Sequence, residues 1–186
     1  MPLTLASQSP RRADILMKLG VAFEVVKTNA PEVSIPHDPE RTVVENATQK
    51  LRACGRVPAL AADTIVWFNG KIYGKPADLA EAKVFLRELS GQTHSVFTGV
   101  AYADDSGVRS TCVRSDVTFR TLSDADIDEY ISLVHPTDRA GAYDINEHGD
   151  LIVASYTGSY ENVMGLPVDP LREWKIVRAR RRGRHS

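Results

Sequence analysis

The sequence of 186 residues predicts an α/β fold in which strands and helices follow one another along the chain. The first observation is the apolar run from Leu3 to Ala6, which stops at two serines and leads at once into a helical pattern behind Pro10. The second is that strand-like runs recur further on between segments with helical spacing. The length and a hydrophobic content of 42% allow one domain with a substantial core, or at most two small lobes around a cleft.

The expected domain organisation is a single domain over residues 1–177 and a basic, flexible tail over residues 178–186. The net charge of the chain is −1, and removing the five arginines of the tail from that total leaves −6 for residues 1–177. A short basic end on an acidic body is more often a solvated terminus than a nucleic-acid contact, so nucleic acid is the weaker expectation. No apolar run reaches the roughly 18 to 20 residues of a membrane span, and no signal peptide is indicated. We therefore expect a cytoplasmic protein without a membrane partner.

The first helix is expected to be capped by the Ser9 hydroxyl and ended by Gly20. A further helix should start at Asp38-Pro39 and close at Gly55, because its apolar positions recur at helical spacing. The other expected elements are strands at 22–26, 60–68 and 71–73, a helix opened by Asp78, long strands at 93–104 and 108–119, a helix opened by Ser123, a strand at 151–154 and a last helix from about 170.

The N-terminus of the first helix is a candidate phosphate site. Free backbone N–H groups, the positive end of the helix dipole, the hydroxyls of Ser7 and Ser9 and the guanidinium groups of Arg11 and Arg12 converge there. The alternative is an ordinary capped helix with a solvated arginine pair, and these residues alone do not separate the two.

Asp63 is the strongest single candidate for a catalytic or metal-binding residue. It interrupts a strand that is otherwise apolar, and a buried carboxylate costs several kcal/mol unless it is paired or bound to metal. A structural partner such as an arginine would explain it, and so would a metal or general-base role. Lys75 stands between Gly74 and Pro76, which should hold its backbone in place.

The sequence favours a hard metal ion over zinc. The five histidines show no metal-type spacing, and Cys54 and Cys112 lie far apart, so Mg²⁺ or Mn²⁺ is the expected ion. Neither a nucleophile elbow, a Walker loop nor a Rossmann fingerprint is present. Cations suited to phosphate, together with carboxylates and no nucleophile, indicate metal-assisted hydrolysis of a phosphoanhydride.

Five motifs resemble one known family in order and spacing: LASQSPRRADIL, the lysine late in the second helix, AADTIVWFNGKIYGKP, SGQTHSVFTGVA, and DRAGAYDIN with GSYENVMGLPVDPL. Over residues 3 to about 174 the chain resembles the Maf family of nucleoside triphosphate pyrophosphatases, also described as septum-formation inhibitors. The resemblance implies an elongated, twisted mixed sheet flanked by helices, with a cleft between two lobes, and a homodimer. It also implies a metal-dependent hydrolysis of nucleoside triphosphates to monophosphate and pyrophosphate.

The resemblance also assigns roles to residues. It implies that Asp63 is the proton acceptor and a metal ligand, with Glu32 as a second ligand. It makes Ser7, Arg11, Arg12, Lys50 and Lys75 contacts of the triphosphate, and it places Arg11, Thr64 and Asn146 where base preference is set.

Two departures bear on these roles. Arg11 and Thr64 match the branch that acts on dTTP and UTP, but Asn146 stands where that branch usually has glutamine. The loop before the second helix reads Val33-Ser34-Ile35 where many members have an Asp-Glu pair, which leaves Glu32 as the nearest carboxylate.

The expected activity is therefore a pyrophosphatase reaction on dTTP, UTP or modified pyrimidine nucleotides, in a housecleaning role. The alternatives are a pyrophosphatase for modified purine nucleotides such as 7-methyl-GTP, a non-enzymatic nucleotide-binding regulator of septum formation, and a nucleic-acid binder acting through the tail. An intact Asp63 with Lys50 and Lys75 favours an enzyme, because a sensor needs no base beside the phosphates.

Overall fold

The computed structural model describes residues 2–177, so the basic tail expected at 178–186 lies outside the described residues. The strands are β1 (Leu3–Ala6), β2 (Phe23–Val26), β3 (Ala59–Phe68), β4 (Lys71–Tyr73), β5 (Thr93–Asp104), β6 (Gly107–Phe119) and β7 (Val153–Thr157). They form one seven-stranded sheet in the order β2-β1-β3-β5-β6-β7, with β4 paired to β3. β1 runs parallel to β2 and β3, whereas the other pairs are antiparallel. The predicted mixed α/β fold is confirmed.

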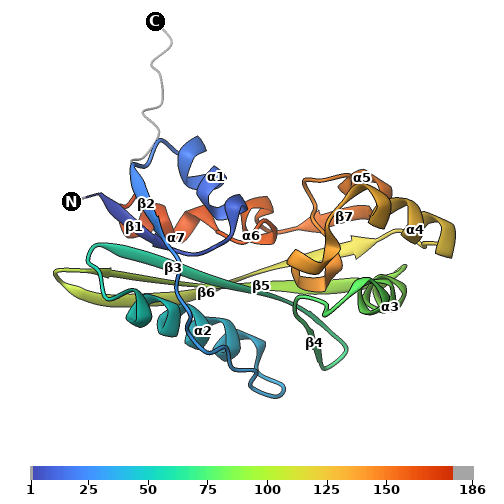
Figure 1. Cartoon of the computed structure of the whole chain (residues 1–186), viewed down its shortest axis with the longest axis horizontal. Coiled ribbons are helices and arrows are strands. Elements are labelled where there is room, and N and C mark those ends of the chain that lie inside the picture. The colour runs from blue at the N-terminus through green and yellow to red at the C-terminus, as the bar shows by residue number, and fades with distance from the viewer. Residues whose placement is uncertain (1, 178–186) are drawn as a thin grey trace, which may run out of the picture.

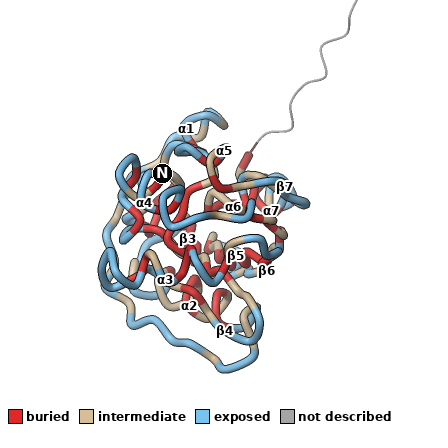
Figure 2. The backbone as a smooth tube through the Cα atoms, turned by 90° about the vertical axis from the view of Figure 1, so that its right-hand side faces the viewer, coloured by how far each residue is buried: buried red, intermediate tan, exposed pale blue. Residues whose placement is uncertain are grey.

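The helices are α1 (Pro10–Lys18), α2 (Pro39–Cys54), α3 (Leu79–Leu89), α4 (Asp124–Leu133), α5 (Gly149–Ile152), α6 (Tyr160–Val163) and α7 (Val168–Glu173), with 3-10 turns η1 (Pro136–Asp138) and η2 (Ala140–Ala142). The sheet follows the long axis of the molecule, with α2 on one face and α1, α6 and α7 on the other (Figure 1). The same two layers are visible in the view turned by 90° (Figure 2). Within residues 2–177, no helix is both long and apolar enough to cross a bilayer.

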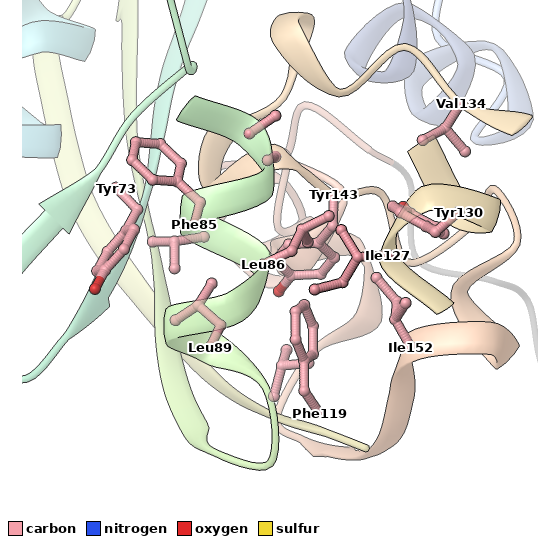
Figure 3. Packing of buried hydrophobic residues seen from close by; sticks show 14 of the residues in the cluster. Tyr73, Phe85, Leu86, Leu89, Phe119, Ile127, Tyr130, Val134, Tyr143 and Ile152 are labelled. Carbon is pink, nitrogen blue, oxygen red and sulfur yellow. The ribbon is translucent and has the colours of Figure 1, made fainter. Parts of the chain in front are cut away.

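Each end of the elongated sheet has its own hydrophobic cluster. At one end, α1 and α7 pack on β1 around Leu5, Leu16 and Leu171, all fully buried. At the other end, α3 and α4 pack on the sheet and on the chain around Phe119 and Tyr143 (Figure 3). Burial of such side chains stabilises each cluster by roughly 1.5–3 kcal/mol per residue. Two separate clusters on one sheet match the expected pair of lobes.

The limits of α2 agree with the prediction. Asp38 Oδ1 accepts a hydrogen bond from the backbone N–H of Arg41 at 2.9 Å, and Gly55 ends the helix at φ 61°. The helix lies unusually close to β5, because a Cβ added at Gly99 would sit 2.3 Å from the carbonyl carbon of Val43. A glycine at this position therefore allows α2 to pack directly on the strands that carry the site.

Two local predictions are wrong. The strand expected at 151–154 starts only at Val153, because the apolar residues before it complete α5 and bury Ile152 in the hydrophobic cluster. A short apolar run does not distinguish these alternatives by periodicity. The Ser9 hydroxyl makes no capping bond; instead, the Ser9 backbone N–H donates to Ser7 Oγ at 3.1 Å. The preceding turn, rather than the helix, is thereby stabilised.

Candidate active site

The site lies where one edge of β3 is open. β1 pairs with β3 as far as Leu60, and β4 joins the same edge from Val66 onward. Between them, in the part of the chain that the structure describes, residues 61–65 have a strand partner only on the β5 side. A cleft of about 660 Å³ opens at this gap and is lined from both ends of the sheet. The cleft expected between two lobes is therefore present, and side chains from both faces of β3 reach it.

Asp63 is buried, with 6% of its surface exposed, and it faces α2. Its Oδ2 accepts a hydrogen bond from Asn46 Nδ2 at 2.9 Å, and its Oδ1 lies 2.7 Å from Lys50 Nζ. Asn46 is itself held by the backbone of Val33, which donates to its Oδ1 at 2.8 Å and accepts from its Nδ2 at 3.1 Å. Asn46 is not among the residues predicted from the sequence, although its position four residues before Lys50 places both side chains on one helix face.

Lys50 joins the two carboxylates that the resemblance implies as metal ligands. Its Nζ lies 2.7 Å from Glu32 Oε1 as well as 2.7 Å from Asp63 Oδ1. The Glu32 side chain is 62% exposed, whereas that of Asp63 is 9% exposed. The arginine partner considered for Asp63 is thus a lysine, and this lysine also lines the cleft.

Arg12 makes three hydrogen bonds to other parts of the protein. Its Nε donates to the carbonyl of Gly165 at 2.7 Å, its Nη1 to Ser7 Oγ at 3.1 Å and its Nη2 to Thr64 Oγ1 at 3.1 Å. Burial lowers the pKa of the guanidinium to about 10, and the nearby charge of Asp63 opposes that shift, so Arg12 is charged at neutral pH. The residue therefore ties the start of α1 to β3 and to the turn after α6.

Arg11 faces a second buried carboxylate, that of Asp144, which is not among the predicted site residues. Asp144 Oδ2 lies 3.6 Å from Arg11 Nη1 and 3.5 Å from Arg139 Nε, and Arg139 Nη2 pairs with Glu147 at 2.6 Å. Burial and the charge of Arg139 lower the pKa of Arg11, while Asp144 raises it. The signal available in the sequence was the alternation of acids and arginine from 138 to 147.

Lys75 and Asn146 contact groups other than Asp63. Lys75 Nζ pairs with Asp138 at 3.0 Å on the exposed rim of the cleft. Asn146 is exposed and is not part of the cleft lining; its Oδ1 accepts from Tyr160 Oη at 3.2 Å, and its backbone N–H donates to Asp144 Oδ1 at 2.8 Å. Its place in base recognition stays a prediction.

The cleft collects most of the residues expected to form the site: Ser7, Arg11, Arg12, Glu32, Lys50, Asp63, Thr64 and Lys75. Three of its cations pair with carboxylates, Lys50 with Asp63, Arg11 with Asp144, and Lys75 with Asp138. A polyanion that enters can replace these carboxylates as the partner of the cations. The arrangement is suited to bind a chain of phosphates beside the buried carboxylate of Asp63.

Comparisons of the sequence with known proteins show the family of the chain. The family model described as "Maf-like protein" matches residues 2–174. The chain is 45% identical over 172 residues to a dTTP/UTP pyrophosphatase of Escherichia coli K12, which covers 89% of this chain and 87% of the relative. It is 41% identical over 174 residues to a dTTP/UTP pyrophosphatase of Akkermansia muciniphila, covering 90% of this chain and 91% of the relative. The resemblance noted in the motifs is confirmed, and the chain belongs to the Maf family.

Proposed function

We propose that this protein hydrolyses the bond between the α- and β-phosphates of nucleoside triphosphates and releases a nucleoside monophosphate and pyrophosphate. The observation that carries the proposal is Asp63, a buried carboxylate that opens onto a cleft lined by arginine and lysine side chains. The names of the relatives support dTTP and UTP as the substrates.

In this proposal Asp63 orients a water molecule and takes its proton as the water attacks the α-phosphorus. Lys50 leaves Asp63 and Glu32 and pairs with phosphate oxygens, which frees Asp63 Oδ1 to accept the proton. Arg11 and Lys75 hold the rest of the phosphate chain in line, and Asn46 keeps the Asp63 carboxylate in position through its bond to Oδ2. No covalent intermediate is required.

We propose Glu32 and Asp63 as the residues that would hold Mg²⁺ or Mn²⁺. Among residues 2–177 no group of three or more His, Cys, Asp or Glu side chains could hold a metal. Two carboxylates suffice for Mg²⁺ when phosphate oxygens and waters complete its shell, and both face Lys50 Nζ at 2.7 Å. When bound, such an ion neutralises charge on the phosphate oxygens.

A panel of nucleoside triphosphates tests the proposal. The protein is incubated with dTTP, UTP, dCTP, dATP, dGTP and 7-methyl-GTP, with Mg²⁺, with Mn²⁺ and with a chelator, and pyrophosphate is measured separately from orthophosphate. We expect pyrophosphate from dTTP and UTP in the presence of either metal. Release of orthophosphate, or binding without turnover, contradicts the proposal, and the second result favours a nucleotide-binding regulator.

Asp63→Asn is the variant that tests the role of the carboxylate. It keeps the size of the side chain but removes the base, so we expect kcat to fall at least about a hundredfold. Lys50 keeps Glu32 as a partner in this variant, so the unfolding midpoint should stay close to that of the wild type. Parallel loss of stability and activity would instead indicate a structural carboxylate, and a stable variant with wild-type kcat would refute the assignment.

A further inference from the structure

A directed chain of hydrogen bonds runs through the sheet behind the cleft. Arg12 Nη2 donates to Thr64 Oγ1 at 3.1 Å, Thr64 Oγ1 and Thr98 Oγ1 lie 2.9 Å apart, and Thr98 Oγ1 donates to the carbonyl of Asn162 at 3.0 Å. Thr64 and Thr98 are cross-strand partners on β3 and β5, and Thr98 is fully buried. The far end is held as well, because Asn162 Nδ2 donates to the carbonyl of Val96 at 3.2 Å.

The direction of each bond follows from the groups themselves. A carbonyl oxygen only accepts, so the single hydroxyl proton of Thr98 points to Asn162. The proton between the two threonines must then belong to Thr64, whose hydroxyl donates to Thr98. Because a guanidinium only donates, one of the two lone pairs on Thr64 Oγ1 is taken by Arg12. Thr64 therefore offers the cleft one free lone pair and no proton.

We infer that Thr98 is a positioning residue: it takes the proton of Thr64, which the motifs already place where base preference is set, and so makes Thr64 an obligate hydrogen-bond acceptor toward the nucleoside. Phosphate oxygens of a nucleoside triphosphate accept hydrogen bonds, so they cannot pair with a hydroxyl that has no proton to give. The donors of a nucleotide are the N–H groups of the base and the hydroxyls of the sugar. Thr64 then contacts a donor of the nucleoside, and Thr98 is a positioning residue for that contact. This inference rests on the proposed function for the identity of the ligand.

Three ligands separate the two donors. 5-Methyl-dCTP has a lone pair where dTTP has its ring N–H, and 2′,3′-dideoxythymidine triphosphate lacks the sugar hydroxyl of dTTP. The kcat/KM of each triphosphate is measured, together with the Kd of each α,β-imido analogue, which resists cleavage at the α–β bond. We expect the wild type to prefer dTTP about tenfold over the ligand that lacks the contacted donor.

Thr98→Val is the decisive variant. It keeps the shape of the side chain but removes the acceptor, so the Thr64 proton can turn into the cleft, and the preference should shrink to about threefold or less. Thr98→Ser should retain the wild-type preference. Thr93→Val is the matched control, since it breaks an exposed pair of threonine hydroxyls 2.8 Å apart at the start of β5 and should change no ratio.

The outcomes are separable. A wild type without preference between the ligands, or a Thr98→Val variant with the wild-type ratio, overturns the inference. If Thr98→Val does not fold, Thr64→Val takes its place, and an unchanged Kd ratio in that variant overturns the inference. The two proposals can also fail separately. If the protein releases no pyrophosphate, the proposed function is contradicted; if the wild type still shows the expected Kd preference and Thr98→Val loses it, the inference is supported.

Discussion

At the scale of single residues, Arg12 combines two tasks that the sequence does not separate. An arginine beside a helix N-terminus is expected to bind phosphate, and its removal would then leave the fold intact. In the structure, three of its N–H groups donate to protein groups, one of them the carbonyl of Gly165 in the turn after α6. The residue thus organises the site whether or not it also touches the substrate.

Arg12→Ala should therefore lower stability as well as activity. Charge-assisted hydrogen bonds contribute roughly 1.5–3 kcal/mol each, and several share the cost of ordering one side chain, so we expect the free energy of unfolding to fall by about 2–4 kcal/mol. Denaturant unfolding measures the change. Lys75→Ala is the control, because its ion pair is 66% and 57% exposed and should contribute less than about 1 kcal/mol. An Arg12→Ala variant with the wild-type midpoint would count against this role.

At the scale of elements, α2 carries the partners of Asp63. Asn46 and Lys50 reach the carboxylate only because the helix packs against β3 and β5 at contact distance, where Gly99 pairs with Asp63 in the strand register. Small side chains continue this surface, since Ala47, Ala61 and Ala101 are all fully buried between α2 and the sheet. The distance between helix and sheet is therefore part of the site.

Gly99→Ala tests the close approach. The new methyl group would lie 2.3 Å from the Val43 carbonyl, so α2 must shift, and we expect a loss of about 3 kcal/mol in the free energy of unfolding. The same shift should reduce kcat, because Asn46 and Lys50 would move away from Asp63. Gly149→Ala is the control, with its nearest contact at an ordinary 3.6 Å. Wild-type stability and kcat in Gly99→Ala would show that the added methyl group fits without a shift of α2 and would contradict this prediction.

At the scale of the whole molecule, the end of the sheet with Phe119 and Tyr143 contains an ionisable group that burial keeps neutral. His94 is 1% exposed, stacks edge-on against Phe119 and Tyr143, and lies 2.9 Å from Tyr143 Oη through its Nε2. Burial lowers the pKa of His94 from 6.5 to about 4. The neutral form is thus favoured by folding, which makes the stability of the molecule depend on pH.

We expect the free energy of unfolding to fall as the pH drops from about 6.5 to about 4. In this range His94 is protonated in the unfolded chain but stays neutral in the folded chain, so acid favours the unfolded chain. The full contribution is on the order of 3 kcal/mol, present above the unfolded pKa and lost toward the folded one. Unfolding curves across this range should show a smaller slope for His94→Gln than for the wild type, and an unchanged slope for His135→Gln, which alters an exposed histidine. Equal slopes in all three proteins would contradict the assignment.

Association between copies and location in the cell are further properties of the whole molecule. The homodimer and the cytoplasmic location implied by the motifs and the composition stay predictions. Light scattering and cell fractionation test them directly.

Local patterns in the sequence were enough for the class of fold and for most element limits. As expected, α2 starts after Asp38 and ends before Gly55, and Asn69-Gly70 forms the turn between β3 and β4. Both could be predicted because capping and turn chemistry act within a few residues. Asp63 could be singled out because a carboxylate in an apolar strand is costly wherever it folds. The limits of α5 could not be predicted in this way, because the burial of Ile152 depends on residues far away in the chain.

Local patterns alone singled out the side chains that we propose for the chemistry: Asp63 in its apolar strand, the arginines behind Pro10 and the lysines of two further motifs. Their partners came only from the folded chain. These partners lie far away in the sequence: Asn46 and Lys50 contact Asp63, Asp144 lies beside Arg11, and Thr98 lies behind Thr64. Asn46 and Lys50 are close in sequence only to each other. Local propensity acts over a few residues, whereas the direction of a hydroxyl proton or the pairing of a buried charge depends on what the tertiary structure packs against it.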